Sequence, residues 1–271
     1  MKREVREIIY KVKPIHILAK YVAYNNSFYY NRLYKQYDYD NKFKKLQNRA
    51  QGRRCFIVGN GPSLQINDLD ILIKEDCFAS NEIWKVFDST KWRPRYYFLQ
   101  ERYSTETLDF LMNIDAEYIF LSDYYCRFHK GELNEKTICL NAKYCLSRSE
   151  MEFSEHIEKY YIMGSTVSYM AMQVAVYLGY KEIYLIGFDN SYKYEIDKNG
   201  RINDTGKQGA HFYQEDDPKA NVANIYEMGK CYEAFRKYAK SNGIVVKNLT
   251  DGGNLDIFER DNLESVLRSY I

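Results

Sequence analysis

Polar side chains follow several apolar segments of this chain, each at the point where the segment ends. The positions are Asn60, Asn81, Gln100, Ser122 and Asp189. Amide and hydroxyl groups bind a nucleobase or sugar hydroxyls without adding charge. If the apolar segments are parallel strands, these residues meet at the edge of a sheet where α/β proteins bind ligands. We therefore expect a nucleotide or sugar site, with Gln100 and Ser122 binding the substrate.

The turn at residues 59–63 (Gly-Asn-Gly-Pro-Ser) is the segment most typical of a nucleotide site. It follows an apolar run and precedes an amphipathic one, the order of a strand, a tight turn and a helix. Glycine permits positive φ and close approach of a ligand, and Ser63 can cap the next helix, whose free amides suit a phosphate. The third glycine of the dinucleotide fingerprint is absent, which argues against a nicotinamide or flavin. A plain strand-to-helix turn is the alternative.

A second helix start lies at residues 164–166 (Gly-Ser-Thr), before a run of small residues that ends at Gly179. A strand follows and ends at Asp189. The polar run at about 190–220 is too long for an ordinary connection and predicts a lid. His211 within it can act as a general base near neutral pH, or it is a solvated loop residue.

Apolar segments alternate with amphipathic ones along residues 51–271. The expected strands are residues 55–58, 77–81, 96–100, 118–122, 137–140, 182–189 and 244–248. This alternation predicts an α/β fold with a doubly wound, mostly parallel sheet. Residues 1–50 are expected to form a separate basic, tyrosine-rich helical arm.

Charge is distributed unevenly over the 271 residues. Residues 1–54 hold 14 Lys and Arg against 4 Asp and Glu, whereas the remainder holds 25 against 33. A basic arm with interleaved apolar residues suits an anionic membrane surface. Packing on the body, or on a second copy in a homo-oligomer, is the alternative. Nucleic acid is not expected as a partner, since no recognised binding module follows.

Several classes of protein are excluded by missing motifs. The six cysteines form no Cys-x-x-Cys pair, which indicates a reduced protein without structural zinc. A phosphate-binding P-loop and the Gly-x-Ser-x-Gly elbow of hydrolases are absent. The chain shows no signal peptide and no apolar run of the ~20 residues that a membrane span needs. We expect a cytoplasmic protein, peripheral at the inner face of the cell membrane.

The chain resembles bacterial sialyltransferases of glycosyltransferase family 42. It is equally similar to the wider superfamily of MptE-like 6-hydroxymethylpterin diphosphokinases and motility-associated sugar transferases. The resemblance is carried by residues 57–64, the run that ends at Asn81, and residues 178–189, and it covers about residues 53–260. It implies a Rossmann-like sheet of a GT-A-like variant.

The resemblance to sialyltransferases also implies a site and a reaction. The nucleotide-binding residues would be Gly59, Asn60, Gly61, Ser63, Asn81, Gly164, Ser165, Thr166 and Asp189. Tyr192 and Tyr194 would assist departure of the phosphate, and His211 would deprotonate the acceptor hydroxyl. The donor would be a CMP-linked, sialic-acid-like nucleotide sugar and the acceptor a surface glycan, with no metal or other cofactor.

Departures from that pattern keep other functions open. Residues 209–213 (Gly-Ala-His-Phe-Tyr) and 251–255 are closer to the MptE-like branch, and the order of Ser165 and Thr166 is changed. One alternative is a diphosphokinase that needs magnesium and ATP, with Asp189 on the metal. The other is a non-catalytic assembly protein.

Overall fold

The computed structural model describes residues 18, 22, 39–100, 105–122, 134–145, 150–207, 209–213 and 222–268. Within these, the helices are α3 (Tyr39–Lys44), α4 (Ile66–Ile71), α5 (Thr105–Met112), α7 (Val167–Tyr177), α8 (Ile225–Ser241) and α9 (Leu263–Arg268). Two 3-10 helices, η1 (Leu72–Lys74) and η2 (Asn81–Val86), complete them.

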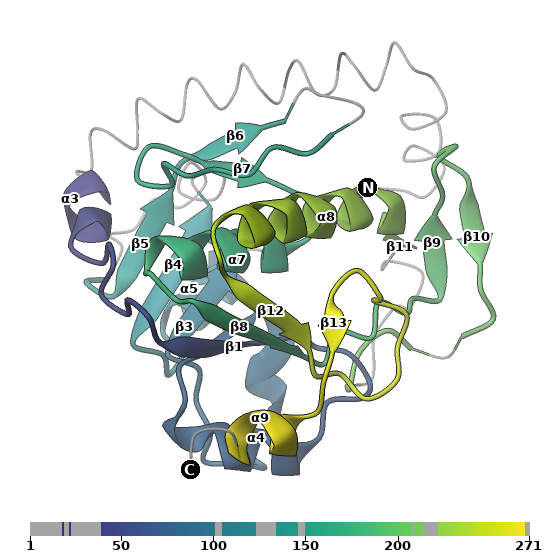
Figure 1. Cartoon of the computed structure of the whole chain (residues 1–271), viewed down its shortest axis with the longest axis horizontal. Coiled ribbons are helices and arrows are strands. Elements are labelled where there is room, and N and C mark those ends of the chain that lie inside the picture. Colours follow the sequence, from purple (N-terminus) through teal and green to yellow (C-terminus); the bar gives the residue numbers. More distant parts are fainter. Residues whose placement is uncertain are drawn as a thin grey trace.

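One eight-stranded sheet forms the centre of the molecule (Figure 1). Its strands are β1 (Arg54–Val58), β2 (Cys77–Ser80), β3 (Tyr96–Leu99), β4 (Tyr118–Ser122), β5 (Thr137–Leu140), β8 (Glu182–Ile186), β12 (Val245–Asn248) and β13 (Glu259–Arg260). The spatial order is β13-β12-β8-β1-β2-β3-β4-β5, and every neighbouring pair is parallel. The predicted doubly wound α/β fold is confirmed.

The order of the strands reverses between β1 and β8. From β1 the chain builds the sheet in one direction as far as β5, and it then returns to place β8 on the other side of β1. The two strands pair from Arg54 with Glu182 to Val58 with Ile186. In open α/β sheets, ligands bind outside the carboxyl ends of the strands at such a switch point. The loops that follow β1 and β8 are therefore where a ligand site is expected.

Both faces of the sheet are buried, because alternate residues along each strand point to opposite sides. In β1, Cys55 and Ile57 pack with α7 and α8, whereas Phe56 and Val58 pack with α4, η2, α5 and α9. The parallel strands accordingly read as continuous apolar runs in the sequence.

The end of the predicted arm belongs to this core. Phe43, Leu46 and Ala50 are buried against α7 and the sheet, and the Phe43 ring stacks on Tyr177 at 4.4 Å. The packed unit thus includes residues that the sequence assigned to the arm. Most of residues 1–38, and residues 214–221 of the predicted lid, lie outside the described residues.

The predicted lid contains a small sheet of its own. Strands β9 (Tyr194–Ile196), β10 (Ile202–Asp204) and β11 (Val222–Ala223) pair in the order β10-β9-β11. A further pair, β6 (Ala142–Tyr144) and β7 (Tyr161–Met163), lies beside the main sheet. The prediction of one long loop was therefore wrong for residues 194–204, because the turn at Asp197 and Gly200 closes a hairpin that polarity did not reveal.

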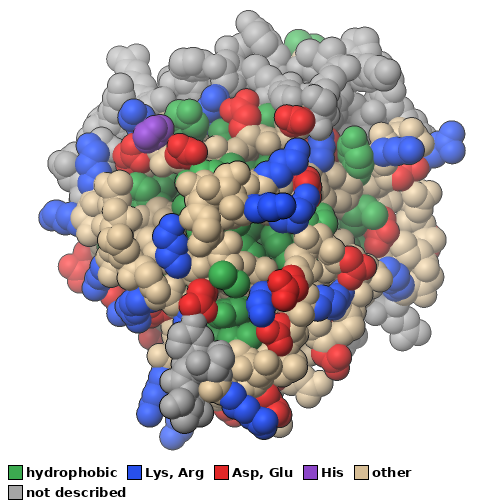
Figure 2. All heavy atoms as spheres, in the orientation of Figure 1, with side chains coloured by type: hydrophobic (Ala, Val, Ile, Leu, Met, Phe, Trp, Pro, Cys, Tyr) green, Lys and Arg blue, Asp and Glu red, His purple; other side chains and the backbone are tan. Residues whose placement is uncertain are grey.

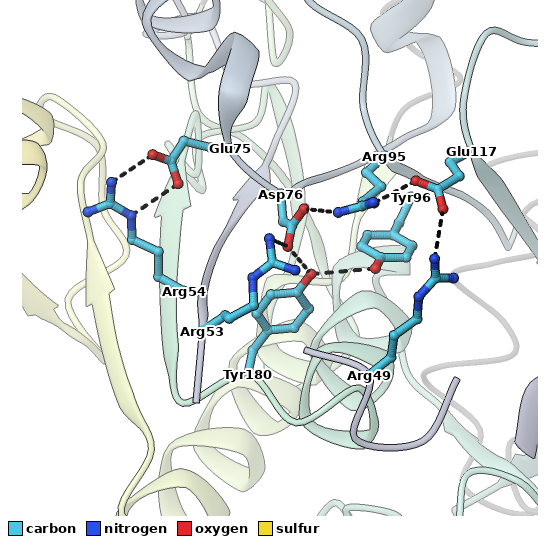
Figure 3. A network of polar contacts seen from close by, with 9 residues as sticks. All are labelled: Arg49, Arg53, Arg54, Glu75, Asp76, Arg95, Tyr96, Glu117 and Tyr180. Carbon is cyan, nitrogen blue, oxygen red and sulfur yellow. Dashed lines mark hydrogen bonds and ion pairs between the residues drawn. The ribbon is translucent and has the colours of Figure 1, made fainter. Parts of the chain in front are cut away.

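A polar network ties the amino ends of the strands together, opposite the switch-point loops (Figure 3). The buried carboxylate of Asp76 pairs with Arg53 at 2.8 Å and Arg95 at 2.5 Å, and it accepts a hydrogen bond from the Tyr180 hydroxyl at 2.6 Å. Burial raises the pKa of Tyr180 well above its ordinary value, so this hydroxyl remains a donor. Arg53, Asp76 and Arg95 directly precede β1, β2 and β3, and Tyr180 lies two residues before β8, so we interpret the network as structural.

The described cysteines include free thiols and a disulfide-bonded residue. Cys55, Cys77, Cys145 and Cys231 are free and buried, while Cys139 is disulfide-bonded, which departs from the expectation that every thiol is reduced. Among the described residues, none of the helices has the length and apolar character that crossing a membrane requires.

Candidate functional site

A cavity of about 90 Å³ lies at the switch point. Its lining residues are Gly59, Asn60, Gly61, Ser80, Asn81, Thr166, Val167, Ser168, Gly187, Phe188, Asp189, Asn190, Ser191, Tyr192, Ala210, His211 and Tyr232. Eight of the residues predicted from the sequence are among them, from five separate parts of the chain. The expected convergence at the carboxyl ends of β1, β2 and β8 is therefore present in the structure.

Three asparagines, Asn60, Asn81 and Asn190, line the cavity. The Nδ2 of Asn60 donates to the Ser80 carbonyl at 3.1 Å, which fixes the orientation of the amide. Its Oδ1 is buried and has no hydrogen-bond partner, and the same is true of Asn190 Oδ1. Asn81 has a φ of 53°, and its carbonyl accepts a hydrogen bond from the Tyr97 hydroxyl. Two buried acceptors without donors suit a ligand that carries N–H or O–H groups.

The glycines of the first turn are required by the protein rather than by a ligand. Neither Gly59 nor Gly61 has a positive φ. A Cβ at Gly59 would overlap the Gly187 carbonyl oxygen, and one at Gly61 would overlap the carboxylate of Asp189. The expectation of positive φ was thus wrong, and the loop after β8 fills the space that any side chain would need.

Asp189 occupies the position at which the sequence suggested a phosphate. Its carboxylate accepts hydrogen bonds from the Ser63 amide at 3.2 Å and the Ser63 hydroxyl at 2.8 Å. Ser63 does not cap the next helix; α4 begins at Ile66, and Gln65 at its N-cap makes no side-chain hydrogen bond. The prediction that Ser63 caps a phosphate-binding helix was therefore wrong.

The amino end of α7 opens into the cavity instead. Thr166 is the N-cap of this 11-residue helix, and its hydroxyl accepts a hydrogen bond from the Ser168 amide at 3.3 Å. Val167 and Ser168 line the cavity beside it. The free amides and positive dipole end of such a helix stabilise an anion. Gly164 and Ser165 do not line the cavity; a Cβ at Gly164 would meet Cys231 Sγ at 2.6 Å.

The two predicted substrate residues lie behind the cavity wall. Ser122 is fully buried and accepts a hydrogen bond from the Tyr161 hydroxyl at 2.8 Å. Gln100 is also buried, and its Nε2 donates to the Gly164 carbonyl at 3.0 Å, just before α7. Neither residue lines the cavity, so direct substrate binding is not supported for Ser122 or Gln100 in this arrangement.

Residues 209–213 cover the cavity. The Phe212 amide donates to the Asn60 carbonyl at 2.9 Å, and its side chain packs against the core cluster that includes Ile83 and Val86 of η2. His211 lines the cavity, and its imidazole stacks on the Tyr213 ring with centroids 4.8 Å apart. This segment is the part of the predicted lid that meets the site, and it places His211 in the cavity lining.

Of the two predicted tyrosines, only Tyr192 lines the cavity. Tyr194 is buried in β9, at 6% exposure, and points elsewhere. Tyr232 on α8 lines the cavity in its place and is 3% exposed. Burial, and to a lesser degree the nearby Tyr192 phenol, raise the pKa of Tyr232 well above its ordinary value, so it is a neutral donor. Nothing in the sequence distinguishes Tyr232 from the other 27 tyrosines.

A larger cavity, about 610 Å³, lies along the outer face of α8. Met151, Phe153, Tyr226, Gly229 and Ile257 line its apolar part. Figure 2 shows this face, where hydrophobic side chains lie between surrounding Lys and Glu side chains. None of the residues predicted for the site lines this cavity.

Within the described part of the chain, His, Cys, Asp and Glu side chains form no group of three that could hold a metal ion. Asp189 is the one carboxylate that lines the switch-point cavity, and Ser63 engages both of its oxygens.

Comparison with known proteins identifies a matching family and a solved structure with a similar fold. The family model described as 6-hydroxymethylpterin diphosphokinase MptE-like matches residues 28–195, more than half of the chain. No curated protein sequence matches significantly. Among solved structures, the chain is similar to the MAf glycosyltransferase from Magnetospirillum magneticum AMB-1, with a TM-score of 0.50 and 20% identity. The likeness covers 81% of this chain but 35% of that one, about a third of its length, and it shows a shared fold.

Proposed function

The chain belongs to the MptE-like family, and on that premise we propose that it is a glycosyltransferase that uses a nucleotide-sugar donor. The observation that carries the proposal is the switch-point cavity, in which Asn60, Asn81, the start of α7 and His211 meet. The structural neighbour is named as a glycosyltransferase, which supports the same reaction class. The product would be a surface glycan.

Each wall of the cavity has a task in this reaction. The Val167 amide and the positive dipole end of α7 would hold the donor phosphate. His211 would accept the proton of an acceptor hydroxyl, whose oxygen attacks the anomeric carbon as the bond to the phosphate oxygen breaks. Tyr192 and Tyr232 would donate hydrogen bonds to the departing phosphate.

The unpartnered amide oxygens favour a base with an exocyclic amine over uracil. Asn60 Oδ1 and Asn190 Oδ1 both need a donor, and the exocyclic amine of cytosine carries two N–H groups. Uracil offers a single N–H. Adenine carries such an amine too, and the resemblance of the sequence leads us to propose a CMP-linked donor with a sialic-acid-like sugar.

Donor binding requires movement of the covering segment. Pockets for small molecules usually measure about 300–1,000 Å³, and the switch-point cavity holds about 90 Å³. Residues 209–213 close it, so the nucleotide would enter when this segment lifts away from Asn60.

A second candidate function follows from the family description. Diphosphokinase activity would place ATP, with magnesium carried on its phosphates, at the start of α7, and His211 would deprotonate the alcohol that attacks the phosphate. This reaction uses the same anion site and the same base. The two functions differ in the nucleotide that is bound and in the need for magnesium.

Calorimetric titration of the purified protein with CMP, CDP, UDP and ATP, each with and without magnesium, tests both functions. Binding of CMP or its sugars without magnesium supports glycosyl transfer, and binding of ATP only with magnesium supports the diphosphokinase. Binding of none would overturn both. The His211→Ala variant should lose transfer by about 10²- to 10⁴-fold and keep its nucleotide affinity. His156→Ala, an exposed histidine remote from the cavity lining, is the control.

A further inference from the structure

Residues 209–213 contact the two segments that contribute Asn60 and Asn81 to the cavity lining. The Phe212 amide bonds the carbonyl of Asn60 in the loop after β1. Tyr213 contacts η2, the element that follows β2 and begins at Asn81. The covering segment is therefore held by the same elements that carry Asn60 and Asn81.

The contact with η2 is a cation–π interaction. The Lys85 ammonium lies 4.2 Å from the centroid of the Tyr213 ring, well within the range of about 6 Å for such contacts. Glu82 pairs with the same ammonium at 2.5 Å and thereby restrains it over the ring. The Lys85 side chain is about a quarter exposed, so the contact is partly shielded from water.

The Tyr213 ring also stacks on the candidate base, His211. The rings of His211 and Tyr213 are nearly parallel, with an interplanar angle of 10°. Phe212 packs edge-on against Tyr213, at 84° and 5.0 Å, and itself lies against the core. Lys85, Tyr213 and His211 therefore form a continuous stack from η2 to the cavity.

We propose that Lys85 and Tyr213 form a latch that holds residues 209–213 closed and sets the plane of the His211 imidazole. Tyr213 is then a positioning residue for His211, and Lys85 acts through Tyr213. The role of the latch in the reaction rests on the proposed function, whereas its role in closing the segment does not. Breaking the stack frees the segment to lift and lets the imidazole rotate.

Amide hydrogen exchange of Phe212 in the full-length protein reports the latch without any substrate. NMR with selectively labelled phenylalanine follows this amide, because its hydrogen bond to Asn60 breaks when the segment lifts. Lys85→Gln should speed exchange about three- to tenfold, as expected from the loss of a cation–π contact. Tyr213→Ala should speed it more, and Tyr213→Phe, which keeps the ring, should restore the rate. Lys74→Gln, an exposed lysine in η1, is the control.

A transfer assay then separates the latch from the proposed function. Lys85→Gln and Tyr213→Ala should lower kcat, with Tyr213→Phe near wild type and nucleotide affinity little changed. Faster exchange in a protein that binds no nucleotide would support the latch and remove the proposed function. Unchanged Phe212 exchange in both Lys85→Gln and Tyr213→Ala would overturn the latch, whatever the activity.

Discussion

The carboxylate of Asp189 accepts hydrogen bonds from both the backbone amide and the hydroxyl of Ser63. The two residues lie 126 positions apart and follow the two strands that flank the switch point. A third segment also contacts Asp189, since the Asn254 amide donates to the Asp189 backbone carbonyl at 2.7 Å. The site is therefore built around a carboxylate that the protein supplies itself, and the amino end of α7 lines the same cavity at Val167 and Ser168.

Replacing Asp189 should weaken both the fold and the site. Asp189→Ala leaves the Ser63 amide and hydroxyl without their acceptor, which costs about 1–3 kcal/mol for partly buried donors. Denaturation by urea measures the loss, and nucleotide affinity should fall with it. Asp251→Ala, an exposed aspartate in a neighbouring turn, should change stability by less than about 0.5 kcal/mol. Equal stability of the two variants would show that the Ser63 contact is unimportant.

Two glycine-to-alanine substitutions should act in opposite directions. Gly61→Ala places a methyl group on the Asp189 carboxylate and should destabilise the protein by about 1–3 kcal/mol. Gly229 lies inside α8 with nothing within 4 Å of an added Cβ, so Gly229→Ala should stabilise it by about 1 kcal/mol. Thermal unfolding measures both shifts. A stabilised Gly61→Ala protein would contradict the crowding argument.

Tyr232 and Tyr194 form a matched pair for testing the site. Tyr232→Phe removes a hydroxyl from the cavity and should lower kcat about 10- to 100-fold if that hydroxyl stabilises the leaving phosphate. Tyr194→Phe removes one outside the cavity lining and should leave kcat within about twofold. Steady-state kinetics with the nucleotide sugar decide between them. If Tyr194→Phe lowered kcat and Tyr232→Phe did not, the role in phosphate departure would belong to Tyr194, as the sequence suggested.

At the amino ends of the strands, Asp76 should be the acidic residue whose replacement costs the most stability. Asp76→Ala leaves Arg53, Arg95 and the Tyr180 hydroxyl without their shared partner, which should cost about 2–4 kcal/mol. The exposed pair of Glu264 and Arg268 is the control, and Glu264→Ala should cost less than about 0.5 kcal/mol. Chemical denaturation measures both, and nucleotide binding should survive in the folded fraction. A small loss for Asp76→Ala would show that the network is replaceable.

The buried thiols should be inert in the native protein. Burial raises the pKa of Cys77 and of Cys231 from near 9 to about 12. Since the thiolate is the reactive form, the reactive fraction at pH 8 falls about a thousandfold, and it rises again only as the pH approaches 12. Alkylation by iodoacetamide, followed by peptide mapping, should be at least 100-fold slower than in urea. Rapid native labelling of Cys77 or Cys231 would contradict this.

Local pattern in the sequence determined the fold and many of the polar residues at the carboxyl edge of the sheet. Each parallel strand is buried on both faces, so it appears as an apolar run, and the polar residue that ends it lies at the edge of the sheet. Asn60, Asn81 and Asp189 were found in this way, as was the start of α7 from its capping Thr166. His211 was found because it lies in a polar segment next to aromatic residues.

Contacts between distant parts of the chain decided the rest. Gly61 is a glycine because Asp189 lies against it, Ser122 is buried because Tyr161 covers it, and Tyr232 enters the cavity because α8 packs on the sheet. None of these contacts leaves a periodic or local signal, since each depends on which strands become neighbours. The sequence by itself determined which strands and rim residues exist, and only the tertiary structure decided which side chains face the cavity, because that depends on packing across the switch point.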